Sequence, residues 1–242
     1  MKVIKGADYA EISSIVANII VDEVKQEPEC VLGLATGSTP EGIYAKLIEK
    51  YEAGEVDFSK VKTVSLDEYK GLSGDNSQSY RYFMDTHLFD HVNIDKSNTF
   101  IPNGLELDSK KACEEYEECL EKVGNPDIQI LGLGLNGHIG FNEPAEEFTK
   151  ETNCVNLTTS TIEANSRFFE SANEVPRQAY TMGIGSIMKA KKIILVVSGE
   201  KKRDILKKSF TEDVTPWVPA SILQKHDNVI LVGDADALGD NF

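Results

Sequence analysis

Five short apolar runs constrain the fold of this chain more than any other feature of its sequence. They are Cys30–Ala35, Val61–Leu66, Ile128–Leu133, Ile193–Val197 and Val229–Val232. Each run is rich in Leu or β-branched residues and hardly alternates with polar residues, which is typical of strands buried on both faces of a parallel sheet. The sequence therefore predicts a mostly parallel central sheet.

Helical patterns lie between these runs. In Ala7–Gln26 the apolar residues recur at helical spacing and form one stripe. A second helix is expected to begin at an N-cap residue, Ser109, and to stop at Gly124. Strands that alternate with such helices predict a doubly wound, Rossmann-like α/β fold.

The length of 242 residues suits a single domain of this class. Neither an internal repeat nor a low-complexity linker divides the sequence, so residues 1–242 are expected to form one domain. The segment near 158–177 is polar and has little apolar spacing. It is expected to act as a mobile lid.

The charge of the chain restricts its partners. Against 25 Lys and Arg stand 40 Asp and Glu, which gives a formal net charge of −15. Proteins that bind nucleic acid need a basic stripe, and this sequence has none of sufficient length. Nucleic acid is therefore not an expected partner, and an anionic substrate would need a local group of cations.

The composition also argues against a membrane protein and against a metal centre. The longest aliphatic run, Ile193–Val197, falls far short of the roughly 20 residues that cross a bilayer. The first residues lack the features of a signal peptide, so a cytoplasmic location is expected. The 4 Cys and 4 His show no metal-ligand spacing, and no cofactor is expected.

In an open α/β sheet, ligands bind beyond the carboxyl ends of the strands, so the residues after each run are informative. After the first run, Gly37 permits a tight turn, Thr39 suits an N-cap and Pro40 suits the first helical position. With the hydroxyl groups of Ser38 and Thr39, the free N–H groups of such a helix start would bind a phosphate. A well-capped helix without a ligand fits these residues equally well.

The fourth run is followed by three adjacent cations, Lys201, Lys202 and Arg203. In so acidic a chain, cations at a strand end are typical of an anion site. Ordinary charge on a helix surface is the alternative, and the sequence does not separate the two.

After the second run come two adjacent carboxylates, Asp67 and Glu68. A carboxylate at a strand end can act as a general base, because partial burial raises its pKa toward a useful value. A helix cap or a solvated turn is the alternative.

The third run leads into a glycine-rich loop. Gly132, Gly134 and Gly137 satisfy the spacing GxGxxG, but further Gly and Pro residues interrupt any helix here, so a dinucleotide site is not expected. The glycines instead allow the backbone to approach a small ligand. His138 lies in this loop with Glu143 close behind, which indicates an imidazole oriented by a carboxylate.

Together these strand ends carry a resemblance that covers essentially the whole chain. The segments are LGLATGSTPEG, VSLDEYKGL, LGLGLNGHIGFNEPA and ANSRFF. They resemble the glucosamine-6-phosphate deaminase family, within the superfamily that also holds 6-phosphogluconolactonase. The combination of GHIGFNEP with LDEY is the specific part, whereas the TGSTP turn is shared across the superfamily.

The resemblance implies a reaction and a set of site residues. The reaction converts glucosamine 6-phosphate and water to fructose 6-phosphate and ammonia by general acid–base catalysis, without a metal or other cofactor. Asp67 would be the acid–base residue of the enolisation step, His138 the ring-opening base, Glu143 its charge-relay partner, and Asn136 would replace an Asp that completes this relay in some members. The implied phosphate contacts are Gly37, Ser38, Thr39, Arg167 and Lys202.

Other functions remain open at this stage. A 6-phosphogluconolactonase-like enzyme or a galactosamine-6-phosphate isomerase would use the same fold, and a sugar-phosphate sensor would bind without catalysis. The expected partner is a small-molecule hexosamine 6-phosphate, and the chain is expected to be a monomer or a small homo-oligomer.

Overall fold

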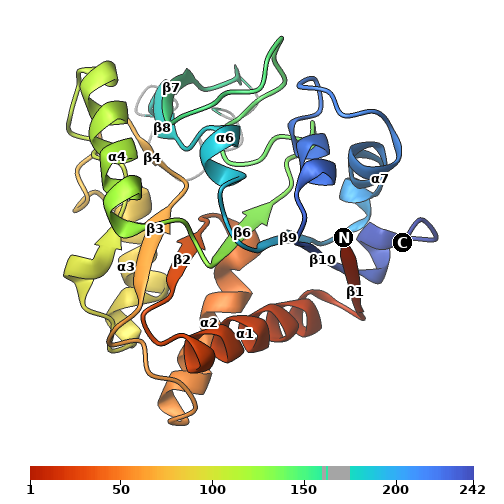
Figure 1. The fold of residues 1–242 in the computed structure, drawn as a ribbon, viewed down its shortest axis with the longest axis horizontal. Helices are drawn as coiled ribbons and strands as arrows, with labels where there is room; N and C mark the ends of the chain where they lie inside the picture. The colour runs from red at the N-terminus through yellow and green to blue at the C-terminus, as the bar shows by residue number, and fades with distance from the viewer. Residues whose placement is uncertain (160–161, 163–174) are drawn as a thin grey trace.

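The computed structural model describes residues 1–159, 162 and 175–242 and is built around a seven-stranded parallel sheet (Figure 1). Every strand pair in this sheet is parallel. In spatial order the strands are β1 (Lys2–Gly6), β10 (Val229–Asp234), β9 (Ile193–Val197), β6 (Ile128–Gly132), β2 (Val31–Leu34), β3 (Lys62–Ser65) and β5 (Thr99–Phe100).

Helices pack on both faces of this sheet. Ile130 joins a core with side chains of α1 and α2, whereas the next residue, Leu131, joins a second core with side chains of α4, α6 and α7. In Figure 1, α1 and α2 lie below the sheet, and α4 and α6 lie above it. The predicted doubly wound α/β fold is confirmed. The α-helices within the described ranges are α1 (Tyr9–Gln26), α2 (Ser38–Glu52), α3 (Tyr80–His87), α4 (Ser109–Val123), α6 (Ile184–Ile187), α7 (Arg203–Thr211) and α8 (Ala235–Leu238). Short 3-10 helices in these ranges are η1 (Phe89–His91), η2 (Lys96–Asn98), η3 (Glu200–Lys202) and η4 (Pro219–Lys225).

A second, antiparallel sheet was not predicted from the sequence. It consists of β4 (Asp67–Tyr69), β8 (Gln178–Thr181) and β7 (Asn153–Asn156). β4 follows β3 after a single residue, and Asp67 pairs with Thr181 of β8. This small sheet therefore carries Asp67 just beyond the carboxyl end of the large one.

Two predicted helix starts are wrong by one or two residues. The N-cap of α4 is Asp108 rather than Ser109, because the Asp108 carboxylate accepts hydrogen bonds from the N–H groups of Lys110 and Lys111. The N-cap of α2 is Gly37 rather than Thr39. The predicted end of α4 at Gly124 is confirmed.

The predicted lid near 158–177 lies largely outside the described residues, as does Arg167. Within the described ranges, no helix combines the length and the apolar composition that crossing a bilayer requires.

Candidate active site

A cavity of about 550 Å³ opens beyond the carboxyl ends of β2 and β6. This is the position that the doubly wound topology favours for a ligand. Of the nine site residues named from the sequence, the structure describes eight, all except Arg167. All eight line this cavity. They are Gly37, Ser38, Thr39, Asp67, Asn136, His138, Glu143 and Lys202.

One side of the cavity is the start of α2. Gly37 has a φ of +88°, a left-handed conformation that glycine adopts without strain, and it sends the chain directly into the helix at Ser38. The hydroxyl of Tyr9 donates to the carbonyl of Ser38 at 2.8 Å and so holds this first turn in place. The N–H groups of a first turn have no partner within their helix, which makes this side suited to an anion.

Lys202 supplies a cation on the same side. Its Nζ donates to the carbonyl of Leu133 at 2.5 Å, and partial burial lowers the pKa of its ammonium group. Lys201 is exposed and does not line the cavity, so of the two adjacent lysines only Lys202 faces the site.

The turn that presents Lys202 is held from the neighbouring strand. Asp234, at the end of β10, accepts hydrogen bonds from the N–H of Gly199, at 3.0 and 3.1 Å to its two oxygens, and from the hydroxyl of Ser198. Gly199 has a φ of +88°, so the chain reverses here before η3 begins. Lys202 is therefore anchored through a buried carboxylate.

Asp67 lies on the opposite side of the cavity. Its side chain is buried, at 6% exposure, and it belongs to the short strand β4. Burial raises the pKa of Asp67 to about 8, and the negative charge of Glu68 adds to the increase. A carboxyl group with such a pKa can exchange protons near neutral pH.

An aromatic wall next to Asp67 was missed in the sequence. The rings of Tyr69, Tyr80 and Phe141 pack together, with centroid separations of 4.7 Å between the two tyrosines and 6.1 Å from each to Phe141. Tyr80 and Phe141 line the cavity directly. Tyr80 starts a helix remote from any strand end, so no pattern in the sequence indicates that it belongs to the site.

The third side is the loop from Leu133 to Pro144, which forms no helix, as its glycines and Pro144 predict. The ring of His138 lies over Gly134, where a Cβ atom would stand only 2.4 Å from three ring carbons. Glycine at this position is therefore needed for the ring to lie where it does.

Glu143 and Asn136 support His138. The Nδ1 atom of His138 lies 3.4 Å from Oε1 of Glu143, and the Nδ2 of Asn136 donates to Oε2 of Glu143 at 2.5 Å. The oxygen of Asn136 accepts from the backbone N–H of His138 at 3.2 Å, so Asn136 contacts the backbone of His138 rather than its ring. Within the described residues, no group of three or more His, Cys, Asp or Glu side chains is arranged to hold a metal ion.

The chain is similar to proteins of one known family. A profile of the family described as glucosamine-6-phosphate isomerases/6-phosphogluconolactonase matches residues 7–232. The chain is 53% identical to a protein named glucosamine-6-phosphate deaminase from Clostridium perfringens (strain SM101 / Type A) over 98% of both chains. It is also 53% identical to a protein of the same name from Thermoanaerobacter sp. (strain X514), over 98% of this chain and 94% of the other.

Solved structures extend the similarity. One, described as a monomeric glucosamine-6-phosphate deaminase, superposes with a TM-score of 0.94 at 43% identity over 98% of both chains. A 6-phosphogluconolactonase from Trypanosoma brucei shares the fold, with a TM-score of 0.76 at 17% identity over 98% of this chain and 97% of the other. The family profile and the identities show that this chain belongs to the glucosamine-6-phosphate isomerase/6-phosphogluconolactonase family.

Proposed function

We propose that this protein is a glucosamine-6-phosphate deaminase, which converts glucosamine 6-phosphate and water to fructose 6-phosphate and ammonia. One observation carries the proposal: a buried carboxyl group, Asp67, and an imidazole, His138, face the same cavity as the start of α2 and Lys202. A hexosamine phosphate needs these groups together: one acid–base residue to open the ring, a second to move the proton from C2 to C1, and an anion site for the phosphate. The names of the relatives at 53% identity support the same activity.

The first step opens the sugar ring. His138 would take the proton from the O1 hydroxyl and deliver it to the ring oxygen, which leaves an aldehyde at C1. Glu143, with Oε1 3.4 Å from Nδ1, would stabilise the imidazolium that forms between the two transfers and orient the ring in that charged state. Asn136 would act one contact further away, by holding the Glu143 carboxylate.

The second step moves a proton from C2 to C1. Asp67 would take the C2 proton while a proton of the substrate's ammonium group moves to O1, which gives an enolamine. Asp67 would then return its proton to C1, which leaves a protonated imine at C2. Water adds to this imine and ammonia leaves, so that C2 becomes the ketone of fructose 6-phosphate. The ammonium form of the substrate, lying beside Asp67, would lower the pKa of this carboxyl group again and favour the carboxylate that the step requires.

The phosphate would bind at the other side of the cavity, on the N–H groups of Gly37, Ser38 and Thr39 and on Lys202. Arg167 is proposed as a further contact from the resemblance alone. Because these groups are remote from C1 and C2, their binding energy would be used to position the reacting carbons against Asp67 and His138.

We further propose that residues 1–242 form one catalytic domain that acts as a monomer. The similar structure at 43% identity, which is described as monomeric, supports this proposal. We also propose a cytoplasmic location, because the relatives at 53% identity are named as enzymes of a phosphorylated sugar, which does not cross a bilayer unaided and so remains in the compartment where it is formed. Light scattering of the purified protein would test the monomer.

The experiment that tests the proposed function mixes the purified protein with glucosamine 6-phosphate and measures ammonia and fructose 6-phosphate together. Equal amounts of both products are expected. Parallel samples receive galactosamine 6-phosphate or 6-phosphogluconolactone. Turnover of either alternative substrate in preference to glucosamine 6-phosphate would overturn the proposal.

A further inference from the structure

The mechanism above leaves one buried carboxyl group of the site without a role, that of Glu68. It follows Asp67 on β4 and is 2% exposed. Because successive side chains of a strand point to opposite faces, Glu68 points away from the face that Asp67 presents to the cavity. Its contacts therefore lie behind the catalytic wall.

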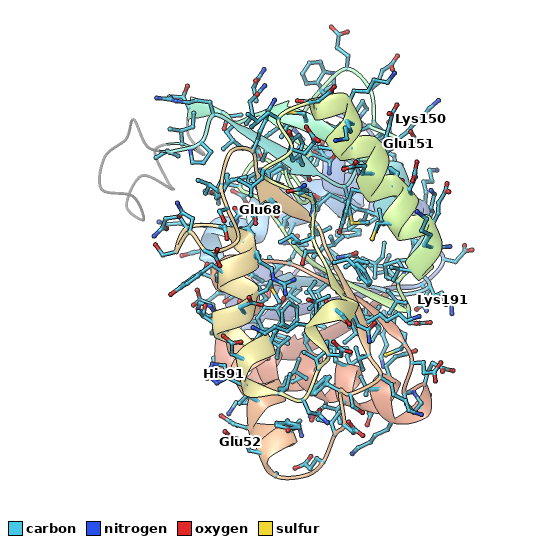
Figure 2. All side chains as sticks on the ribbon, turned by 90° about the vertical axis from the view of Figure 1, so that its left-hand side faces the viewer. Glu52, Glu68, His91, Lys150, Glu151 and Lys191 are labelled. Carbon is cyan, nitrogen blue, oxygen red and sulfur yellow. The ribbon has the colours of Figure 1, made fainter. Side chains whose placement is uncertain are left out.

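Glu68 accepts three backbone hydrogen bonds, which is more than a solvated turn would supply. Its Oε1 accepts from the N–H of Tyr69 at 2.8 Å and of Tyr80 at 2.9 Å, and its Oε2 accepts from the N–H of Arg81 at 2.9 Å. Figure 2 shows Glu68 between β4 and the near end of α3.

The first turn of α3 is thereby fully satisfied. The remaining N–H of that turn, on Tyr82, donates to the hydroxyl of its N-cap, Ser79, at 3.0 Å. A negative charge at the start of a helix also interacts favourably with the helix dipole. Glu68 thus connects the strand that carries Asp67 to the first residue of α3, Tyr80, which lies twelve positions after Glu68 in the chain.

Tyr80 is the link from this turn to the reacting groups. Its ring lines the cavity and stacks on Phe141 at an interplanar angle of 12°. Its hydroxyl donates to that of Tyr69 at 3.2 Å. The first residue of α3 therefore forms part of the wall that shields Asp67 from water.

We propose that Glu68 is a positioning residue for the reaction: by holding the first turn of α3, its carboxylate keeps the Tyr80 ring closed against the cavity beside Asp67. This inference rests on the proposed function only in taking Asp67 as the base.

The charged groups around Asp67 determine the direction in which its pKa should shift when Glu68 is changed. Among the described residues, the titratable groups around Asp67 are Glu68 on its own strand, Tyr69 and Tyr80 in the aromatic wall, Tyr116 from α4, and His138, Glu143 and Lys202 across the cavity. Burial raises the pKa of Glu68 to about 7, against the opposing effect of its three N–H donors and of Arg81. Loss of the negative charge of Glu68 lowers the pKa of Asp67, because that charge opposes ionisation of Asp67. Entry of water past Tyr80 also lowers it, because water solvates the carboxylate.

The test uses Glu68→Gln, which keeps the volume of the side chain but turns one acceptor into a donor that faces a backbone N–H. The midpoint of the Asp67 titration, followed by NMR of ¹³C-labelled carboxyl groups, is expected to fall by about one pH unit. The acid limb of kcat/KM is expected to move down with it, and kcat to fall roughly tenfold because the site is less well ordered. An unchanged midpoint would overturn the proposal.

Glu117→Gln is the matched control. Glu117 is a half-buried carboxylate that also accepts hydrogen bonds from a backbone N–H, that of Thr152 at 2.7 Å, and from the hydroxyl of Ser186, but it lies on α4 outside the cavity. It is expected to lower the melting temperature without moving the Asp67 midpoint. If Glu68→Gln behaves in the same way, its role is structural only.

A second background separates positioning from direct charge. In Tyr80→Ala the wall is already open, so adding Glu68→Gln is expected to shift the Asp67 midpoint much less than in the wild type. An equal shift in both backgrounds would mean that Glu68 acts by its charge alone, against the proposal. The NMR readout needs no turnover, so absence of ammonia release would count against the proposed function without deciding this inference.

Discussion

The two sides of the cavity are built in different ways. On the side of Asp67 the groups are side chains that tertiary structure has removed from water, with Asp67 and Glu68 at 6% and 2% exposure. On the side of α2 the groups are backbone N–H groups at a helix start and one half-buried ammonium group, Lys202. The Asp67 side depends on the removal of carboxyl groups from water, whereas the α2 side depends only on a tight turn at a helix start and on one cation.

This difference separates chemistry from binding. A base that works near neutral pH needs a raised pKa, and burial is the first cause of the raised pKa values of Asp67 and Glu68. A phosphate already carries its charge, so it needs donors at the correct spacing rather than altered ones. Changes on the Asp67 side should therefore reduce kcat, and changes on the α2 side should raise KM.

The largest effect is expected from Asp67→Asn. The amide has the same shape but cannot accept the C2 proton, so kcat should fall by about 10²–10⁴-fold with little change in KM. Steady-state kinetics with glucosamine 6-phosphate would measure both. If the variant keeps most of its turnover, Asp67 is not the base.

A similar loss is expected from Gly134→Ala, where the new Cβ would stand 2.4 Å from the ring of His138. Displacing this ring by about 1 Å should lower kcat roughly 10²-fold. Gly132→Ala is the matched change, because its Cβ would find Thr39 no closer than 3.4 Å, an ordinary contact. Equal losses in the two variants would contradict the assigned position of His138.

On the phosphate side, Lys202→Ala should raise KM roughly 10- to 100-fold, which corresponds to the loss of one charged hydrogen bond, and should weaken inhibition by inorganic phosphate. Ser38→Ala should change KM far less, because the backbone N–H that serves the phosphate remains. Should Lys202→Ala lower kcat and leave KM unchanged, the two sides would not be divided as described.

The smallest effect concerns stability. The pKa of Asp67 is raised in the folded state, so its contribution to stability is complete below its ordinary value near 4 and is lost as the pH rises toward 8. Asp67→Asn removes this loss, and at pH 8 the variant should be more stable than the wild type by about 1 kcal/mol or more, roughly 2–4 °C in Tm. Thermal unfolding at pH 5 and pH 8 would measure it; a gain that is larger at pH 5 has the wrong sign.

The large sheet was predictable because its strands carry a local signal. The predicted strand Ile193–Val197 has the same bounds as β9, because a continuous apolar run indicates both the type of element and where it ends. β1 and β5 lie at the edges of the sheet, are less buried, and were missed. The small sheet was missed because its strands have three or four residues and pair across distant parts of the chain, as Asp67 does with Thr181.

The candidate site divides in the same way. Residues at the ends of predicted strands, such as Gly37 and His138, were found because topology alone brings strand ends together. Tyr80 and the contacts of Glu68 depend on where α3 packs, which no pattern in the sequence indicates. Phe141 was not named from the sequence although it lies in the same loop as His138. The contacts of Asn136 were likewise visible only once the loop was seen folded.

The central claim is that the fold makes Asp67 a base by burying it. The most direct measurement is the titration of its carboxyl group in the substrate-free protein, by NMR of ¹³C-labelled aspartate, with the signal assigned by its loss in Asp67→Asn. The account predicts a midpoint near pH 8. A midpoint near pH 4, the value of an exposed aspartate, would contradict it.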